Sequence, residues 1–165
     1  KKKMQNTYNF SAMVNRMKYI DRWALMPNAN KENIAEHSHS VAVIAHALAL
    51  IGNREFGKNY NPERAALLAL YHDTTEVITG DMPTPVKYYN DEIKSVYKDI
   101  EKTAGDRLLK MLPDDYKQDY VPLFHKSDED KQLWKLVKAA DKISALVKCI
   151  EENRMGNREF DIDIK

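Results

Sequence analysis

Residues 33–51, which read NIAEHSHSVAVIAHALALI, contain the clearest helix pattern in the chain. Asn33 can act as the N-cap, and Glu36 follows three residues later, where its side chain can accept a hydrogen bond from the Asn33 backbone N–H. The apolar residues beyond this cap recur at helical spacing and form one stripe: Ile34, Val41, Ile44, Leu48 and Ile51. The pattern predicts a long helix whose apolar stripe faces the core.

Capping residues, prolines and apolar spacing predict further helices on both sides of this one. The expected helical segments are about 7–20, 33–51, 61–80, 90–113, 114–121 and 127–155. The body of the third segment, Ala65 to Tyr71, is apolar on all sides, which predicts the most buried helix. Gly80 ends that segment, and two prolines stiffen the loop at 81–85. The expected core face of the last segment is Leu133, Leu136, Val137, Ala140, Ile143, Val147 and Ile150. No stretch alternates as a strand does, so the expected fold class is all-α, a compact bundle of about six helices.

Length and composition exclude several classes of protein. A chain of 165 residues favours one domain over 1–165, and 26 Lys+Arg against 25 Asp+Glu give no general affinity for a nucleic acid polymer. Cys149 is the only cysteine, which excludes a disulfide scaffold. The mean hydropathy is −0.64, and no apolar run approaches the roughly 18 residues of a membrane span, so we expect that no segment qualifies as a spanning helix. Because no apolar secretory segment follows Lys1, Lys2 and Lys3, we expect a cytoplasmic protein without a membrane partner.

Four polar residues stand at apolar positions of the expected helices. His37 lies within the stripe of the helix at 33–51, although a lone histidine there is more often a hydrogen-bonded core residue. His72 and Asp73 end the apolar run 67–71, where two ionisable groups are costly to bury without partners. Asp141 lies at the margin of the last core face, where Lys138 is an alternative partner. If the four side chains converge, a divalent cation offsets the cost of burying all of them.

Two imidazoles and two carboxylates predict a single metal ion with open positions for water or substrate. This donor set suits Mn, Co, Fe, Mg or Zn, whereas a closed structural zinc site typically needs thiolates, and the chain has one cysteine. His39 and His46 lie about 200° and about 180° around the helix from His37, so both are expected to face away from the site. His125 stands in a loop and has no predicted position.

The ordered set of His37, His72-Asp73 and Asp141 resembles the signature of the HD-domain metal-dependent phosphohydrolases. A narrower likeness covers about residues 10–160 and is densest between 20 and 90. It is carried by Arg22-Trp23, Glu36-His37-Ser38, Tyr71-His72-Asp73, Glu76-Val77, Thr79-Gly80-Asp81 and Pro83-Thr84-Pro85-Val86-Lys87. These motifs resemble the YfbR-type 5′-deoxynucleotidases, which remove phosphate from deoxyribonucleoside monophosphates. The resemblance implies an HD-domain helical bundle, and since such relatives continue past the position of Lys165, a C-terminal helix is expected to be missing.

The resemblance implies a role for each matching residue. It implies that one divalent ion such as Co or Mn is held by His37, His72, Asp73 and Asp141, and that His37 and Asp141 also contact the substrate. It further implies that Glu76 handles a proton and that Arg22 binds the phosphate as a planar fork. The implied nucleotide contacts are Trp23 at the sugar, where it would reject a ribose 2′-hydroxyl, Asp81 at the 3′-hydroxyl, and Thr84, Pro85, Val86 and Lys87 along the nucleotide. Simpler readings stay open: a surface arginine, a core tryptophan, a turn aspartate, and a glutamate that is solvated or pairs with Lys87.

The functional hypothesis is hydrolysis of a phosphomonoester, in which the metal activates water, Arg22 and Lys87 offset phosphate charge, and Glu76 helps to protonate the leaving 5′ oxygen. The alternatives are an HD-type deoxynucleoside triphosphate hydrolase, a non-catalytic nucleotide- or metal-binding module, and an interaction protein whose buried polar groups satisfy one another. Arg22 and Lys87 are the only obvious basic pair near the motifs, which is few for a triphosphate. The expected partners are a small deoxynucleotide and, from the family, a second copy of the chain. Several aromatic residues could serve either that association or the core: Tyr88, Tyr89, Tyr116, Tyr120 and Phe124.

Overall fold

In the computed structural model, which describes residues 8–162, the predicted helix begins where its cap residues placed it. α2 spans Ile34–Phe56. The Asn33 side chain accepts hydrogen bonds from the backbone N–H groups of Ala35 and Glu36, and Glu36 accepts from the Asn33 N–H, so the capping box is complete. Gly57 ends the helix with a φ of 61°, a backbone conformation that favours glycine.

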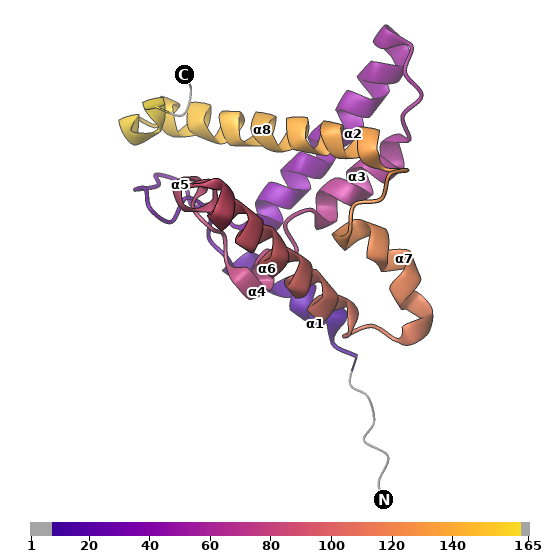
Figure 1. The fold of residues 1–165 in the computed structure, drawn as a ribbon. Helices are drawn as coiled ribbons and strands as arrows, with labels where there is room; N and C mark the ends of the chain where they lie inside the picture. The colour runs from indigo at the N-terminus through magenta and orange to yellow at the C-terminus, as the bar shows by residue number, and fades with distance from the viewer. Residues whose placement is uncertain (1–7, 163–165) are drawn as a thin grey trace, which may run out of the picture.

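Two further helices pack along α2 and form the main core (Figure 1). α3 spans Pro62–Tyr71 and α8 spans Lys131–Arg154. The buried apolar residues of this core are Val41, Ala45, Ala49, Ala65, Leu68, Ala69, Leu123, Leu133, Val137 and Ala140. Many of these side chains are alanines, so the three helix axes approach closely and bring polar groups on different helices within contact distance.

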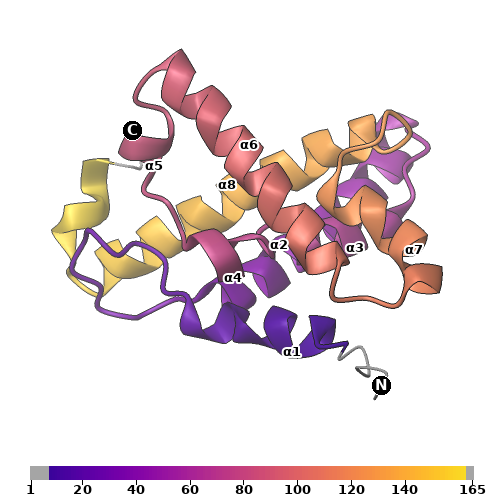
Figure 2. The same cartoon turned by 60° about the horizontal axis from the view of Figure 1, so that its bottom comes forward.

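A second, smaller core lies between the N-terminal segment and α6, which spans Asp91–Leu109 (Figure 2). The N-terminal segment consists of α1, Phe10–Val14, and a 3-10 turn, η1, Asn15–Tyr19. Phe10 packs here against Leu108, Leu109 and Leu112. α7 spans Asp114–Phe124, and a last 3-10 turn, η2, spans Arg158–Ile162. All elements within the described residues are helical apart from one isolated β-bridge, which confirms the all-α prediction.

Two predicted helices are each divided into shorter elements. The segment expected at 7–20 tightens into η1 after Val14, as helix ends often do, and its first residue, Thr7, lies outside the described residues. The segment expected at 61–80 ends as an α-helix at Tyr71, runs through a turn at 72–75, and resumes as α4, Glu76–Thr79. Two β-branched threonines, Thr74 and Thr75, follow the His-Asp pair in this turn and weaken helix continuation.

The loop expected at 81–85 is shorter than predicted, because α5 forms over Thr84–Lys87. Proline is tolerated in the first turn of a helix, since the N–H that it lacks has no partner there in any case. Pro85 therefore lies in the first turn of a short helix, where the sequence predicts only a stiff loop.

Burial differs from the prediction in α3 and in the second half of α8. Leu67 and Leu70 of α3 are 39% and 44% exposed, so α3 presents one apolar face to solvent and is not buried on all sides. In α8, the predicted core residues Ile143, Val147 and Ile150 are exposed. Ser144, Lys148 and Glu152 are buried instead, because this half of the helix packs on a loop rich in backbone polar groups rather than on apolar side chains.

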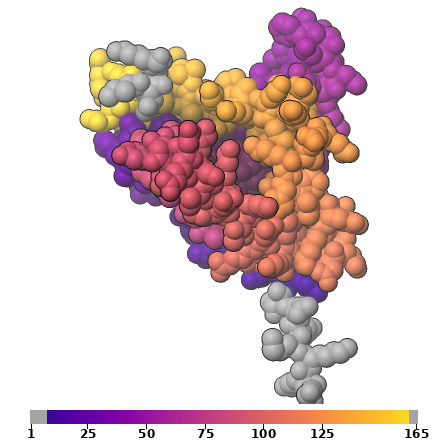
Figure 3. Space-filling view, in the orientation of Figure 1, coloured from indigo at the N-terminus to yellow at the C-terminus, as the bar shows by residue number. Residues whose placement is uncertain are grey.

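The apolar content of α2 exceeds what the sequence analysis expected. Over 18 residues its mean hydropathy reaches 1.3, so by length and composition alone it is able to cross a membrane, and the expectation that no segment qualifies is wrong. Alanine, isoleucine and leucine between the histidines and serines raise this average. In this fold the same residues pack against α3 and α8, and the C-terminal end of α2 projects from the body at the upper right of Figure 3.

Candidate metal and active site

Three helices that are distant along the chain bring the candidate metal ligands together. His37 lies on the first turn of α2, His72 is the C-cap residue of α3, and Asp141 lies in the middle of α8. One nitrogen or oxygen atom of each lies within 4.8 Å of the others, and the two imidazole rings are 5.4 Å apart between centroids. His37 is fully buried. Burial of an ionisable side chain is unfavourable without polar partners, and those of His37 come from other parts of the fold.

Asp73 joins this cluster from the turn after α3. Its Oδ2 lies 3.1 Å from His72 Nε2 and 3.6 Å from His37 Nε2, while Asp141 Oδ1 lies 3.0 Å from His37 Nε2. The structure therefore brings together all four residues that the sequence analysis proposed as ligands.

The orientation of His72 fits metal binding. Its Nδ1 lies 2.6 Å from the carbonyl oxygen of Ala69, so this nitrogen carries the proton and donates it to the helix end. Nε2 then carries a lone pair, and it is buried without a hydrogen-bond donor facing it in the described residues. A buried imidazole nitrogen fixed in this tautomer is the form that binds a divalent cation.

The charges of the cluster also favour a cation. Burial alone would lower the pKa of His72, but the carboxylates of Asp73 and Asp141 raise it above its usual range. Burial would raise the pKa of Asp73, yet His72, His37 and Arg22 hold it well below its ordinary value. The pKa of Asp141 is lowered in the same way, mainly by the hydrogen bond from His37. The two carboxylates are thus ionised and available as ligands at neutral pH.

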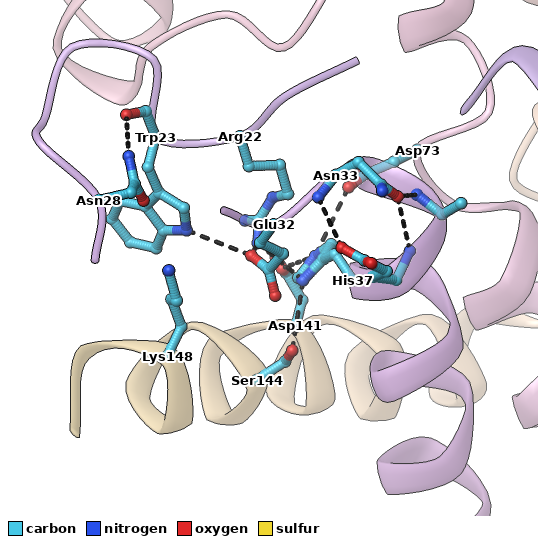
Figure 4. Close-up of polar contacts among 12 residues, drawn as sticks. Arg22, Trp23, Asn28, Glu32, Asn33, His37, Asp73, Asp141, Ser144 and Lys148 are labelled. Atoms are coloured by element: carbon cyan, nitrogen blue, oxygen red, sulfur yellow. Dashed lines mark hydrogen bonds and ion pairs between the residues drawn. The ribbon is translucent and has the colours of Figure 1, made fainter. Parts of the chain in front are cut away.

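The far side of His37 contacts two residues, one of which the sequence analysis did not identify (Figure 4). Its Nδ1 lies 2.8 Å from Nη1 of Arg22 and 3.2 Å from the hydroxyl of Ser144. Ser144 is buried and follows Asp141 by three residues, so both lie on one face of α8. That spacing is the sequence feature from which Ser144 could have been found.

Arg22 and Trp23 lie together in the loop between η1 and α2. The carboxylate of Glu32 accepts hydrogen bonds from Arg22 Nη1 at 2.7 Å and from the Trp23 indole N–H at 3.2 Å. Glu32 thereby fixes both side chains next to the candidate ligands His37 and Asp141 (Figure 4). Nothing in its surroundings along the sequence marks Glu32, because its two partners are identified only once the loop closes on itself.

Trp23 has an unusual backbone conformation, with a φ of 59°. This left-handed region costs a residue with a large side chain on the order of 1–3 kcal/mol and persists only where the surroundings determine it strongly. Such strain is concentrated at binding sites, which favours a role for Trp23 in recognition rather than as an ordinary core aromatic.

Glu76 begins α4, next to the cluster, and is 7% exposed. Burial, together with the carboxylates of Asp73 and Asp81, raises the pKa of Glu76 to about 9. A carboxyl group that keeps its proton at neutral pH is able to act as a general acid. Burial likewise raises the pKa of Asp81 above its usual range, with Asp73 adding to the effect.

The predicted nucleotide-lining residues lie on α5 and are mostly exposed. Thr84, Pro85 and Val86 face solvent. The amine of Lys87 donates a hydrogen bond to Glu101 of α6 at 2.7 Å and lies 4.6 Å from the ring centroid of Tyr97. The partner of Lys87 is therefore Glu101, and the ion pair with Glu76 that the sequence left open does not form.

The remaining histidines lie outside the cluster. His39 is exposed on α2, and His46 is half-buried further along the same helix. His125 lies 2.8 Å from Asp106, a pair that links the end of α7 to α6. An open groove of about 720 Å³ lies between residues 58–64 and 129–133, but it contains none of the cluster residues. The arrangement of donor groups, rather than groove size, identifies the site.

The sequence is similar to a known family of proteins and to several of its members. The family model described as 5′-deoxynucleotidase YfbR-like matches residues 9–164. A 5′-deoxynucleotidase of Vibrio parahaemolyticus is 55% identical over 155 residues, which cover 92% of this chain and 78% of that protein. A 5′-deoxynucleotidase of Vibrio cholerae is 52% identical over 157 residues, which cover 95% of this chain and 80% of that protein.

Solved structures share the fold. An HD-domain phosphohydrolase from Listeria innocua superposes with a TM-score of 0.80 at 23% identity, covering 92% of this chain and 73% of that chain. The HD phosphohydrolase DatZ of cyanophage S-2L was solved with dA and one catalytic Zn²⁺ ion. It superposes with a TM-score of 0.63 at 22% identity, and the match covers 84% of this chain and 69% of that chain. At these identities the likeness concerns the helical architecture.

Proposed function

Because the chain belongs to the YfbR-like 5′-deoxynucleotidase family, we propose that the polar cluster between its helices is the active site and holds one divalent metal ion. The enzyme is a metal-dependent phosphohydrolase that removes the 5′-phosphate of deoxyribonucleoside monophosphates. The proposed ligands are His37, His72, Asp73 and Asp141. The observation that carries the proposal is the convergence of these groups, in which Nε2 of His72 faces Asp73 and Nε2 of His37 faces Asp73 and Asp141.

A divalent ion bound there would supply a Lewis acid, which would polarise a phosphate oxygen and lower the pKa of a bound water molecule to near neutral. The residues of the chain supply the rest of the chemistry. His37 and Asp141 border the phosphate as well as the ion. Arg22, already adjacent to His37, offers its guanidinium to the equatorial phosphate oxygens and offsets their charge.

Hydrolysis forms one bond from a water oxygen to phosphorus and breaks the bond from phosphorus to the 5′ oxygen. Glu76, which holds its proton at neutral pH, donates that proton to the leaving 5′ oxygen. The attacking water loses a proton in the same reaction, which restores the acid form of Glu76. The products are inorganic phosphate and a deoxynucleoside.

We assign the sugar and base contacts to the elements around the cluster. Trp23 forms the wall at the 2′ carbon and leaves no room for a ribose hydroxyl, and Asp81 accepts a hydrogen bond from the 3′-hydroxyl. Thr84, Pro85, Val86 and Lys87 lie along the nucleotide. The exposure of α5 supports this assignment, because residues that contact a ligand must be open to solvent before it binds.

The direct test is a substrate panel with purified protein. Release of inorganic phosphate from dAMP, dGMP and dTMP with Co²⁺ or Mn²⁺, and slow release from AMP, is the expected result. Release of pyrophosphate or triphosphate from a deoxynucleoside triphosphate would instead assign a triphosphate hydrolase. Nucleotide binding with no product under any metal would assign a binding module.

A Glu76→Gln variant tests the general acid. We expect kcat to fall by about 10²–10⁴ while the metal content stays unchanged, since the amide cannot donate a proton to the leaving group. Glu63→Gln, at an exposed position on α3, is the matched control. Full turnover by Glu76→Gln would remove this residue from the mechanism.

The identity of the metal, the assembly and the location are further parts of the proposal. Two imidazoles and two carboxylates suit cobalt or manganese, which elemental analysis of the purified protein would identify.

We propose a homodimer, supported by the exposed apolar residues Ile143, Leu146, Val147 and Ile150 on α8, and light scattering would measure its mass. Tyr88, Tyr89 and Tyr116 are also exposed, whereas Tyr120 and Phe124 pack against the core. A cytoplasmic location is proposed as well, and the single cysteine, which permits no internal disulfide, is compatible with it.

A further inference from the structure

Backbone hydrogen bonds join the two ends of the loop that carries Arg22 and Trp23. The backbone N–H of Arg22 donates to the carbonyl of Glu32 at 2.9 Å, and the N–H of Ile34 donates to the carbonyl of Ile20 at 3.0 Å. In the middle of the loop, residues 24–30, one further backbone bond from the Met26 N–H to the Trp23 carbonyl, at 3.1 Å, closes a single turn. A strained tryptophan at the edge of such a loop needs support from elsewhere in the fold.

Glu152 provides this support from the C-terminal part of α8. It is fully buried, with an exposed fraction of 0%. Its two carboxylate oxygens accept hydrogen bonds from the backbone N–H groups of Ala29, at 2.8 Å, and Asn30, at 2.9 Å. The side chain of Asn157 donates to the same carboxylate at 2.6 Å and to the carbonyl of Pro27 at 2.7 Å.

Lys148, one turn earlier on α8, neutralises this buried carboxylate. Its amine forms an ion pair with Glu152 and donates to the carbonyl of Asn30. The amine also lies 5.6 Å from the ring centroid of Phe160. One loop segment is thus held through both its N–H and its C=O groups by a charged pair on a rigid helix.

The same support reaches the Trp23 side chain. Phe160 of η2 is fully buried, and its ring lies 5.2 Å from the indole ring between centroids. The side chain of Asn28, within the supported segment, donates to the carbonyl of Trp23 at 3.2 Å. Figure 2 shows the loop lying beside the end of α8 and η2, and Figure 4 shows Lys148 below the indole ring.

We propose that Glu152, with Lys148 as its counter-charge, is the positioning residue for Trp23 and thereby sets the selectivity for a deoxyribose over a ribose sugar. The inference rests on the proposed function, in which Trp23 borders the 2′ carbon. Glu152 touches no substrate in this scheme. It acts through the backbone of residues 27–30, and through Lys148 and Phe160, which lie beside the Trp23 indole.

The chemistry of the pair favours positioning over simple stabilisation. A buried ion pair is often no more stabilising than apolar residues of the same volume, because both charges lose their water. A carboxylate that accepts from successive backbone N–H groups does, however, fix the path of a loop that has no regular structure. The glutamine amide has the same size but only one acceptor oxygen, so Glu152→Gln removes the fixation while filling the space.

The test compares Glu152→Gln with Glu151→Gln, a matched change at the exposed neighbouring position. Protein labelled with 5-fluorotryptophan gives one ¹⁹F resonance for Trp23 and one for Trp134, and a Trp134→Phe variant assigns them. In Glu152→Gln we expect the Trp23 resonance to shift or broaden. The ratio of kcat/KM for dAMP to that for AMP should fall by at least about tenfold. The kcat for dAMP and the cobalt content should stay within about twofold of the unmodified enzyme, and Glu151→Gln should change neither readout.

An unmoved Trp23 resonance, or an unchanged selectivity ratio despite a moved resonance, would overturn the proposal. Should Glu152→Gln not fold, Asn157→Ala loosens the same carboxylate from a partly exposed position and is expected to shift both readouts in the same direction. A failure of the proposed function is distinguishable, because it would appear as absent dAMP hydrolysis in the unmodified enzyme. A failure of the positioning role would appear only in the variants.

Discussion

At the level of single residues, each histidine of the cluster is oriented by a partner on the side away from the metal position. His72 donates its Nδ1–H to the Ala69 carbonyl, and His37 Nδ1 faces the Ser144 hydroxyl, which is able to accept its proton. Such partners hold the ring and its tautomer so that Nε2 is directed at the ion. Under the proposed function, the affinity for metal should therefore depend on groups that do not bind the ion.

Replacing Ser144 by alanine tests this dependence. Without the hydroxyl, the Nδ1–H that His37 carries when Nε2 binds metal loses a buried acceptor, and we expect the affinity for Co²⁺ to fall by about 10–100-fold. Competition with a chelating dye measures the affinity, and Ser95→Ala, at an exposed position on α6, serves as the control. An unchanged dissociation constant in Ser144→Ala would show that the Ser144 hydroxyl does not orient the ring.

The sequence predicted the residues of the cluster because ionisable groups in apolar runs are costly and so stand out. It did not predict Glu32, Lys148 or Glu152. Their partners are backbone groups and side chains up to about 120 residues away, and nothing along the chain marks them before the loop closes on α8. Lys148 and Glu152 are also four positions apart in a helix, and this spacing is typical of an exposed ion pair on a helix surface.

At the level of elements, the starts of α2, α3 and α6 were predictable and helix interruptions were not. Asn33, Asn61 and Asn90 all cap through their side chains, because capping is a local interaction. The turn at 72–75 and the left-handed backbone of Trp23 depend on contacts made by distant elements. The burial of the second half of α8 was predicted wrongly for the same reason, since its neighbour is a polar loop.

The contact between α8 and this loop should be sensitive to acid. Burial alone would raise the pKa of Glu152, but Lys148 and the backbone N–H groups of Ala29 and Asn30 outweigh burial and hold the pKa at about 2. A carboxylate whose pKa is depressed in the folded state stabilises that state above its unfolded pKa, and this contribution is lost as the pH falls from about 4.5 towards 2. The melting temperatures of the unmodified protein and of Glu152→Gln should therefore differ at pH 6 and converge as the pH approaches 2. Parallel curves across this range would contradict the assignment.

At the level of the whole molecule, the site exists only when the chain is folded. His37 and Asp141 are 104 residues apart in sequence, and His72 comes from a third helix. The unfolded chain cannot bring these groups together, so it binds the ion weakly, and metal binding is linked to global stability. The fold class was predictable from periodicity, whereas the distances between ligands required the packing of α2, α3 and α8.

Divalent metal should accordingly raise the melting temperature. At about 100 times the dissociation constant the gain is about 2.7 kcal/mol, which corresponds to roughly 5–10 °C in a protein of this size. Calorimetry with Co²⁺ or Mn²⁺, followed by reversal with a chelator, measures the effect. Asp141→Ala should lose most of the shift, and an equal shift in that variant would place the ion elsewhere.

The spacing of residues along α8 has a consequence for how the enzyme can change. Asp141, Ser144, Lys148 and Glu152 follow one another at intervals of three, four and four, so they share one side of the helix. The proposed metal ligand Asp141 and the proposed positioning residue Glu152 are eleven positions apart, about 16 Å along one helix. Inserting or deleting a single residue between them would rotate one against the other by about 100°. If both proposed roles hold, the length of α8 between these positions can vary far less than that of the surrounding loops, because a change would misplace either the metal ligand or the support of the sugar wall.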